Sequence, residues 1–420
     1  MLKKISVDDL KPGMYVTNIT QEGVRLGDDK REGRIKDEVT IKALQQRGVK
    51  ELFIDTEKGD DSILAVPFDQ ELPTDDQAIV DKALDKPLPT RQLEDEIHTS
   101  SSQAKESIDA QANSFEKELE RAGKIHNEAL GMISKTLESV QKGQAIDTKP
   151  FEDMASSFMD SVVRNQNALA CLSRIRDKDS YLLEHSVNVA VLMSILGKYL
   201  KLDNKYLHEC VTGALLHDIG KVLVPDTILH KAGKLTTEEF TIMKRHAFYS
   251  QKILEKGKSF PQVSINVAGQ HHERIDGKGY PTGLKGEEVT QEARMAAVVD
   301  VYDAITADRV YHVGMTPSAA LKRMLTWCGD HLDVKYVHAF IKAMGVYPVG
   351  SLVELNNGMA GVVIEETGST TKPVLRVMYN LKSKSFVKVT RLDLSSTDKI
   401  SIVKSIDPAD HGIKLKDFLS

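Results

Sequence analysis

Five histidines with accompanying aspartates occupy a succession of apolar helical segments, and this pattern constrains the fold more than any other feature. Apolar helical faces pack inward, and burying so many polar rings without partners would cost on the order of several kcal/mol. Divalent metal ions shared between these side chains would satisfy them together. The positions concerned are His185, His217, Asp218, His246, His271, His272, Asp300 and Asp303, the last two lying three residues apart on one helical face.

Each of these features has a simple structural explanation when taken alone. A single histidine on a helix is usually a satisfied core or surface residue. The His217–Asp218 pair at the end of CVTGALLHDIGK is also compatible with a helix cap, with Gly220 as the expected helix terminator. The stretch DGKGYP is compatible with a tight turn. Only the combination therefore points to a metal site.

Periodicity and composition divide the chain into four segments, and the fold class is mainly α. The first segment reads as a small α/β module with strands at KISVDDL, MYVTNI and KELFID and a helix at VTIKALQQRG closed by Gly48. A polar linker and a long helix follow, and then an all-helical domain. The last segment alternates like β-strands, with a hairpin turn at Asn356, Asn357 and Gly358. The expected domains are 1–70, 71–147, 148–343 and a β-rich appendage at 344–420.

Charge and cysteine content limit the classes of function. The formal net charge of −5 argues against general affinity for a nucleic acid polymer or an anionic membrane. The longest apolar run, 187–197, is too short to span a bilayer and better suits a buried helix. The first residues lack the apolar core of a signal peptide. Three widely spaced cysteines indicate reduced thiols. We expect a cytoplasmic protein.

Three blocks carry a resemblance to a known family. HDIGK at 217–221, HHERIDGKGYP at 271–281 and VVDVYDAITADRVY at 298–311 resemble the signature blocks of the HD-GYP domain, in the family's order and approximate spacing. This branch of the HD-domain phosphohydrolases hydrolyses cyclic dinucleotides, above all cyclic di-GMP. The segments ISVDDLKPGMYV and GVKELFID also resemble an uncharacterised module found ahead of bacterial HD-GYP domains.

The resemblance implies a role for each matching residue. The implied metal ligands are His185, His217, Asp218, His246, His271, His272 and Asp300, with Asp218 bridging two ions. Lys221 is expected to face the scissile phosphate, and Asp303 to orient a ligand. Substrate contacts are expected from Gly279, Tyr280, Arg309 and His312.

The chain departs from the family pattern in three places. Some members bind a third metal through a glutamate four residues before the first histidine; Tyr181 stands there, which favours two ions, although Glu184 is close by. The usual second cation after the arginine is replaced by His312. Ile275 takes the place of a common tryptophan.

The chemistry expected from this ligand set is phosphodiester hydrolysis. Imidazole with carboxylate suits transition metals such as Fe(II) or Mn(II) better than Mg²⁺ or Ca²⁺. We expect a cyclic-dinucleotide phosphodiesterase with two divalent ions that releases a linear 5′-phosphorylated dinucleotide. Its substrate is cyclic di-GMP or, as an alternative, 3′,3′-cyclic GMP-AMP.

Two different functions are also compatible with the sequence. One is a catalytically silent module that responds to cyclic dinucleotides, and the second is a nucleotide phosphohydrolase of the wider HD superfamily. The retained HD pair argues against the former, and the GYP block with its extended ligand set argues against the latter. A homodimer, and signalling partners bound through the N-terminal module, are further expectations.

Overall fold

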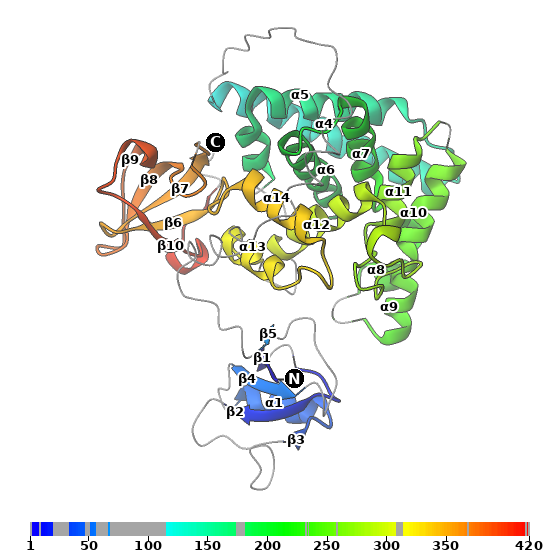
Figure 1. Ribbon diagram of the computed structural model, residues 1–420, viewed down its shortest axis with the longest axis horizontal. Helices are drawn as coiled ribbons and strands as arrows, with labels where there is room; N and C mark the ends of the chain where they lie inside the picture. The colour runs from blue at the N-terminus through cyan, green and yellow to red at the C-terminus, as the bar shows by residue number, and fades with distance from the viewer. Residues whose placement is uncertain are drawn as a thin grey trace. The chain divides into compact units, whose positions relative to one another are not determined.

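The computed structural model forms two compact units, Met1–Thr74 and Asp75–Ser420 (Figure 1). It describes residues 2–7, 10–19, 33–46, 51–55, 66–67, 115–173, 181–231, 233, 235–257, 259–307, 314–367, 369–415 and 418. Each unit has its own cluster of buried apolar side chains.

In the part that the structure describes, the N-terminal unit is a five-stranded sheet with one helix. Its strand order is β3-β2-β4-β1-β5, and β1 pairs with β4 antiparallel in the register Leu2↔Asp55. The expected strands and helix are confirmed, whereas Gly48 lies outside the described residues. The elements are β1 (Leu2–Ser6), β2 (Tyr15–Ile19), β3 (Gly33–Arg34), α1 (Glu38–Gln46), β4 (Glu51–Asp55) and β5 (Val66–Pro67).

The described part of the second unit begins with helices, as expected for the long helix within 71–147 and for the helical domain 148–343. Its longest helices are α4 (Phe115–Gln141), α5 (Lys149–Leu172) and α6 (Tyr181–Tyr199). The other elements are α7 (Asn204–Leu216), η4 (Ile219–Leu223), α8 (Asp226–Leu229), α9 (Thr237–Met243), α10 (Arg245–Lys256), α11 (Gln262–Gln270), η5 (Gly286–Glu288), α12 (Gln291–Thr306), α13 (Pro317–Leu325) and α14 (Val334–Met344).

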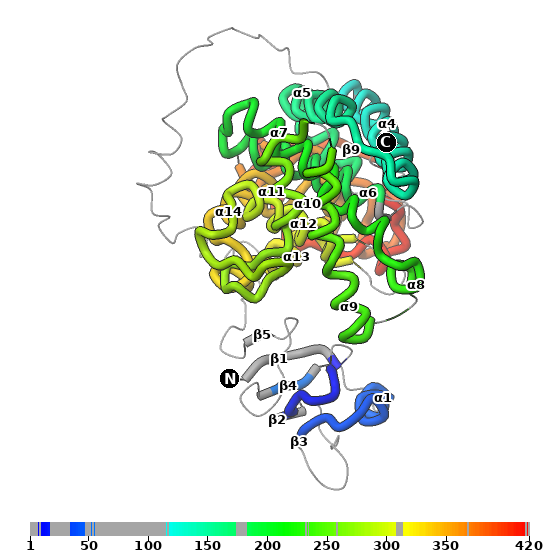
Figure 2. Tube along the Cα trace, turned by 90° about the vertical axis from the view of Figure 1, so that its right-hand side faces the viewer, coloured from blue at the N-terminus to red at the C-terminus, as the bar shows by residue number. Residues whose placement is uncertain are grey.

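Helix α6 lies at the centre of this bundle because its apolar run has no polar face. Residues 187–196 are buried throughout, and α6 contacts α4, α5, α7, α12 and α14. Figures 1 and 2 show these helices gathered around it. Such an all-round apolar helix is typical of a core position. Within the described residues, no helix is both long and apolar enough to cross a membrane.

Gly220 does not terminate a helix, which corrects the expectation from the sequence. Helix α7 ends at Leu216, and Gly220 lies inside the 3-10 turn η4. A Cβ at this position would lie 2.2 Å from the carbonyl oxygen of His246 and 2.4 Å from the amide nitrogen of Ser250. Glycine is needed here because η4 packs directly on the backbone of α10, which brings the HD pair next to His246.

The C-terminal segment folds as a five-stranded antiparallel sheet in the order β10-β6-β7-β8-β9. The hairpin at 356–358 is confirmed, with Gly358 at φ +81° between β6 and β7. Strand β9 was not among the expected strands, and its side chains are mostly exposed. Buried residues of the sheet belong to the same apolar cluster as the helices. The strands are β6 (Leu352–Leu355), β7 (Met359–Glu365), β8 (Val374–Asn380), β9 (Ser385–Asp393) and β10 (Ile402–Ser405).

Candidate metal centre

The helical bundle brings together all seven residues that the sequence analysis named as metal ligands. They form two groups, and within each group one potential ligand atom per residue lies within 4.8 Å of every other. Helices α6, α10 and α12 and the ends of α7 and α11 supply them, so no single segment makes the site. The first group is His185, His217 and Asp300, and the second is Asp218, His246, His271 and His272.

Asp218 lies between the two groups and joins them. Its Oδ2 is 3.5 Å from Nε2 of His185 and 3.4 Å from Nε2 of His217. Its Oδ1 is 3.3 Å from Nε2 of His246 and 3.9 Å from Nε2 of His271. One carboxylate therefore presents a separate oxygen to each group, which is the arrangement that a shared ligand of two ions requires.

Three of the histidines are oriented by the backbone of their own helices. Nδ1 of His217, His246 and His271 each donates a hydrogen bond to the carbonyl oxygen three residues earlier, over 2.8, 2.7 and 3.0 Å. A carbonyl can only accept, so Nδ1 carries the proton and Nε2 carries the lone pair in the neutral ring. All three rings thus direct a lone pair into the cluster.

The donor atoms fit a metal ion because the protein itself leaves several of them unsatisfied. Among the described residues, the buried atoms without a hydrogen-bond partner include Oδ1 of Asp218 and Nε2 of His246 and His271. The Asp218–His246 approach of 3.3 Å is an ion-pair distance that does not meet hydrogen-bond geometry. A bound metal ion would satisfy these three atoms together.

Burial keeps most of these histidines neutral. It lowers the pKa of His246 to about 4 and of His272 to about 3, and it also lowers the pKa values of His217 and His271. Neutral imidazole is the form that binds metal. The site is therefore set to accept cations at neutral pH without first releasing protons from these rings.

The pKa values of His185 and of the carboxylates Asp218 and Asp300 are shifted so that these three groups are charged. Burial lowers the pKa of His185, but its hydrogen bonds to Asp300 and Asp303 outweigh burial and raise the pKa to about 9. Burial raises the pKa of Asp218, yet the charge of Lys221 and the neighbouring histidines hold it well below its usual range. The pKa of Asp300 is likewise held below its usual range, chiefly by His185. Both carboxylates are thus ionised.

Lys221 lies on η4 with its ammonium group against Oδ2 of Asp218. Its side chain is 18% exposed, so the charge is near the surface of the cluster and not sealed within it. The amine therefore lies at the edge of the cluster, next to the carboxylate that joins the two groups.

The HHERIDGKGYP loop covers one side of the cluster with an aromatic ring. The ring of Tyr280 lies 4.7 Å from that of His272 and 6.1 Å from that of His246. Gly279 is required for the packing of the loop itself, because a Cβ there would lie 2.3 Å from the amide nitrogen of Arg274. Glycine at this position was expected to favour close approach of a ligand, and the structure adds this second reason for it.

Glu273 organises this loop, a role that the sequence analysis missed. Its carboxylate is 2% exposed and accepts hydrogen bonds from the backbone amides of Thr282, Gly283 and Leu284. One sequence feature could have indicated this role. An acidic residue directly before a glycine-rich turn is suited to accept hydrogen bonds from the backbone amides of that turn.

Two expected substrate contacts cannot be placed. Arg309 and His312 lie outside the described residues, and the side chain of Tyr181 is not described either. Glu184 is buried in α6, next to His185.

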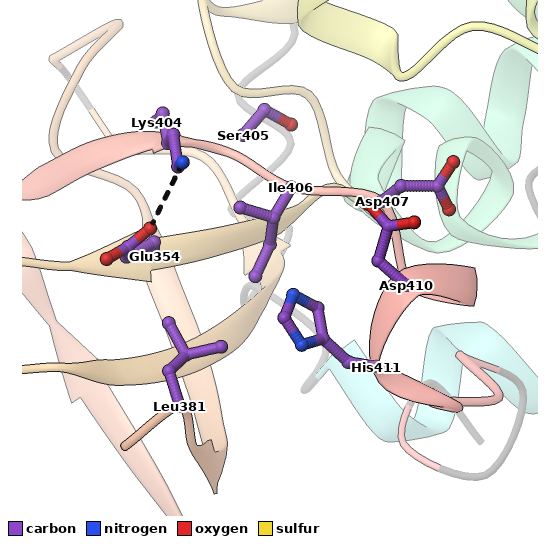
Figure 3. Close-up of a pocket in the computed structure, with 8 residues that line it drawn as sticks. All are labelled: Glu354, Leu381, Lys404, Ser405, Ile406, Asp407, Asp410 and His411. Carbon is purple, nitrogen blue, oxygen red and sulfur yellow. Dashed lines mark ion pairs between the residues drawn. The ribbon is translucent and has the colours of Figure 1, made fainter. Parts of the chain in front are cut away.

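A separate cavity of about 340 Å³ lies on the C-terminal sheet, far along the chain from the cluster. It is lined by residues of β6, β10 and the short helix η7 (Ala409–His411), including an ion pair between Lys404 and Glu354 (Figure 3). None of the residues predicted to bind metal or substrate lines this cavity, and we therefore do not assign the reactive centre to it.

Fold and site together define a class: a helical HD-type phosphohydrolase domain with two His/Asp groups that could hold metal ions. Comparison with family models places an HD domain at residues 170–335, a domain of unknown function (DUF3391) at 2–151 and a KOW domain associated with HD domain at 352–414. The resemblance read from the three signature blocks is thus confirmed.

Similar curated proteins extend this match over nearly the whole chain. The cyclic di-GMP phosphodiesterase PA4108 of Pseudomonas aeruginosa is 36% identical over 98% of this chain and 93% of its own length. A probable cyclic di-GMP phosphodiesterase of Vibrio cholerae is 38% identical over 41% of this chain and 42% of its own. The 3′3′-cGAMP-specific phosphodiesterase 3 of the same species is 35% identical over 41% and 37%. The chain belongs to the HD-GYP family.

Proposed function

We propose that this chain is a metal-dependent phosphodiesterase that hydrolyses a cyclic dinucleotide. The proposal rests on the position of Asp218, which presents one carboxylate oxygen to each of two His/Asp groups. Several donor atoms of these groups have no hydrogen-bond partner among the described residues. A mononuclear or structural metal site would not need a carboxylate shared in this way.

Cyclic di-GMP is the first candidate substrate. The relative that aligns along almost the whole chain is named as a cyclic di-GMP phosphodiesterase. A relative named for 3′3′-cGAMP aligns with only 41% of the chain, so cyclic GMP-AMP is the second candidate. The domain division 1–70, 71–147, 148–343 and 344–420, with a regulatory N-terminal module, a homodimer and a cytoplasmic location, belongs to the same proposal.

The residues fit two divalent transition-metal ions. His185, His217 and Asp300 would hold one, and His246, His271 and His272 the other, with Asp218 shared. The nitrogen-rich set favours Fe(II) or Mn(II) over the hard cations Mg²⁺ and Ca²⁺. When bound, such ions neutralise phosphate charge and lower the pKa of water.

The protein's own groups position and stabilise the reaction. Lys221 offers its ammonium group to the phosphate oxygens, on which negative charge increases as water adds to phosphorus. Asp303 holds the ring of His185 through Nδ1. Tyr280 closes the side of the cluster next to His272. One water is consumed, the bond between phosphorus and O3′ breaks, and the products are a 3′ hydroxyl and a 5′ phosphate.

The test combines metal content with product analysis. Wild-type protein loaded with Fe(II) or Mn(II) is expected to hold about two ions per chain and to convert cyclic di-GMP to a linear 5′-phosphorylated dinucleotide. The Asp218→Ala variant is expected to lose turnover and most of its metal, whereas Asp160→Ala, an exposed aspartate of α5, should keep both. A folded wild-type chain that binds two ions yet leaves both cyclic dinucleotides intact would instead indicate a silent signalling module.

A further inference from the structure

Phe240 places an exposed aromatic ring next to the Tyr280 loop that covers the metal centre. Helix α9 has no buried residue, and Phe240 on it is 48% exposed. Its ring lies 6.5 Å from that of Tyr280, edge to face at 82°, and Tyr280 in turn contacts His272. The two rings therefore continue an aromatic surface outward from the cluster.

Lys244 adds a positive charge to this surface. It lies between α9 and α10, two residues before His246, and its Nζ is 5.3 Å from the centre of the Phe240 ring and 5.9 Å from that of Tyr280. No ion pair of Lys244 with another described residue is seen, in contrast to Lys231, which pairs with Glu239 of α9. The charge is thus available to an anion.

We propose that Phe240 and Lys244 form the subsite for the half of the cyclic dinucleotide that is not attacked. This rests on the function proposed above. A cyclic dinucleotide carries two bases and two phosphates, and only one phosphate lies at the metal cluster. Phe240 stacks against the second base, and Lys244 binds the second phosphate. An aromatic face accepts any base, and an ammonium group binds phosphate as a point charge.

The chain contains a matched control for this pair. Phe248 on α10 is 45% exposed, and Lys252, again four residues later, lies 5.5 Å from its ring centre. The ring contact of Phe248 within the described structure is with Tyr249, not with the loop that carries Tyr280. The two Phe–Lys pairs thus share composition, spacing and an exposed ring, but only the Phe240 ring meets Tyr280. Lys252 also differs from Lys244 in forming an ion pair with Glu255, 2.6 Å away.

The experiment measures the dissociation constant of cyclic di-GMP by calorimetry on the full-length, metal-loaded chain, with Lys221→Ala in every variant to slow turnover. Loss of one stacked base predicts that Phe240→Ala raises Kd by about tenfold and that Phe240→Trp restores it. Lys244→Met is expected to raise Kd by about fivefold. Phe248→Ala and Lys252→Met should leave Kd within about twofold of the parent.

Separate outcomes decide the subsite and the function. Unchanged Kd values for Phe240→Ala and Lys244→Met, or equal rises in the Phe248 and Lys252 variants, would overturn the subsite. Hydrolysis is measured in parallel on the chain with Lys221 intact. A chain that binds cyclic di-GMP through Phe240 without cleaving it overturns only the phosphodiesterase function, and absence of any binding overturns both.

Discussion

Nδ1 of His185 donates a hydrogen bond over 2.7 Å to a carboxylate oxygen of Asp303, and both side chains are buried. The other three oriented histidines of the cluster donate Nδ1 to backbone carbonyls. An ionised partner makes a ring a stronger donor of its remaining lone pair than a neutral carbonyl does. His185 is therefore expected to be the most basic imidazole of the site. Burial lowers its pKa, but the hydrogen bonds to Asp300 and then to Asp303 outweigh burial and raise the pKa to about 9.

The first prediction concerns this pair. Asp303→Asn keeps the shape of the side chain but removes its charge, and we expect metal affinity to fall by about 10–100-fold. Competition with a chromophoric chelator measures the affinity. Asp160→Asn on the exposed face of α5 is the control. Metal affinity equal to wild type in Asp303→Asn would show that Asp303 supports the fold and not the ligand.

The second prediction concerns Lys221, whose ammonium group contacts Asp218. Lys221→Ala is expected to lower kcat by roughly 10²–10³ because charge stabilisation in the transition state is lost. Metal content, measured by elemental analysis of the same sample, should stay at the wild-type value. Loss of metal together with activity would mean that Lys221 holds the ligand set in place and does not act on the phosphate.

The third prediction concerns the loop held by Glu273. In Glu273→Gln one oxygen becomes an amide nitrogen that cannot accept from the backbone amides of residues 282–284. We expect faster hydrogen exchange at these amides and a loss of about 1–3 kcal/mol of local stability. Glu288→Gln in η5, which accepts from a single amide, Lys285, is the control. Unchanged exchange at 282–284 would contradict the role given to Glu273.

The fourth prediction is a pH dependence of stability. Burial raises the pKa of Glu366 to about 7 against the opposing hydrogen bond from Gln166. A carboxyl whose folded pKa is raised stabilises the fold fully below its unfolded pKa, near 4.5, and this contribution is lost as pH rises through about 7. Glu366→Gln resembles the protonated form and should remove that part of the decline.

The measurement for Glu366 is the melting temperature of both proteins between pH 4.5 and 8. The difference between wild type and Glu366→Gln is expected to grow with pH across this window, in favour of the variant, because wild type alone must bury a charge. Titration of the histidine cluster is common to both proteins and cancels. A difference that stays constant with pH would mean that Glu366 ionises in the folded state as freely as in the unfolded chain.

Features that depend on a single helix or a single turn could be predicted from the sequence. The three-residue spacing of Asp300 and Asp303 placed both on one face of α12, and both are buried there. The apolar run 187–197 predicted a core helix, and Asn356–Gly358 predicted a hairpin, as found. Strand β9 was not predicted, although Val387, Lys388, Val389 and Thr390 alternate between apolar and polar, and its side chains are mostly exposed.

Features that join distant segments were not predictable from periodicity. The sequence suggests a helix end at Gly220, because nothing local reveals that the backbone of α10 lies against it. The roles of Glu273 and Phe240 could not be predicted for the same reason. They depend on contacts with the loop amides and with the Tyr280 ring, which lie in other segments of the chain.

The sequence by itself determined the ligand types and their order on successive helices, because side-chain chemistry and 3.6-residue periodicity are local properties. It also indicated the family, through the resemblance of its three signature blocks. Only the tertiary structure decided which oxygen of Asp218 faces which group, which ring nitrogen each histidine turns inward and where the charge of Lys244 lies. His185 and Asp303 are 118 residues apart. Their 2.7 Å contact exists because α6 and α12 pack against each other, and packing is a property of the whole apolar core.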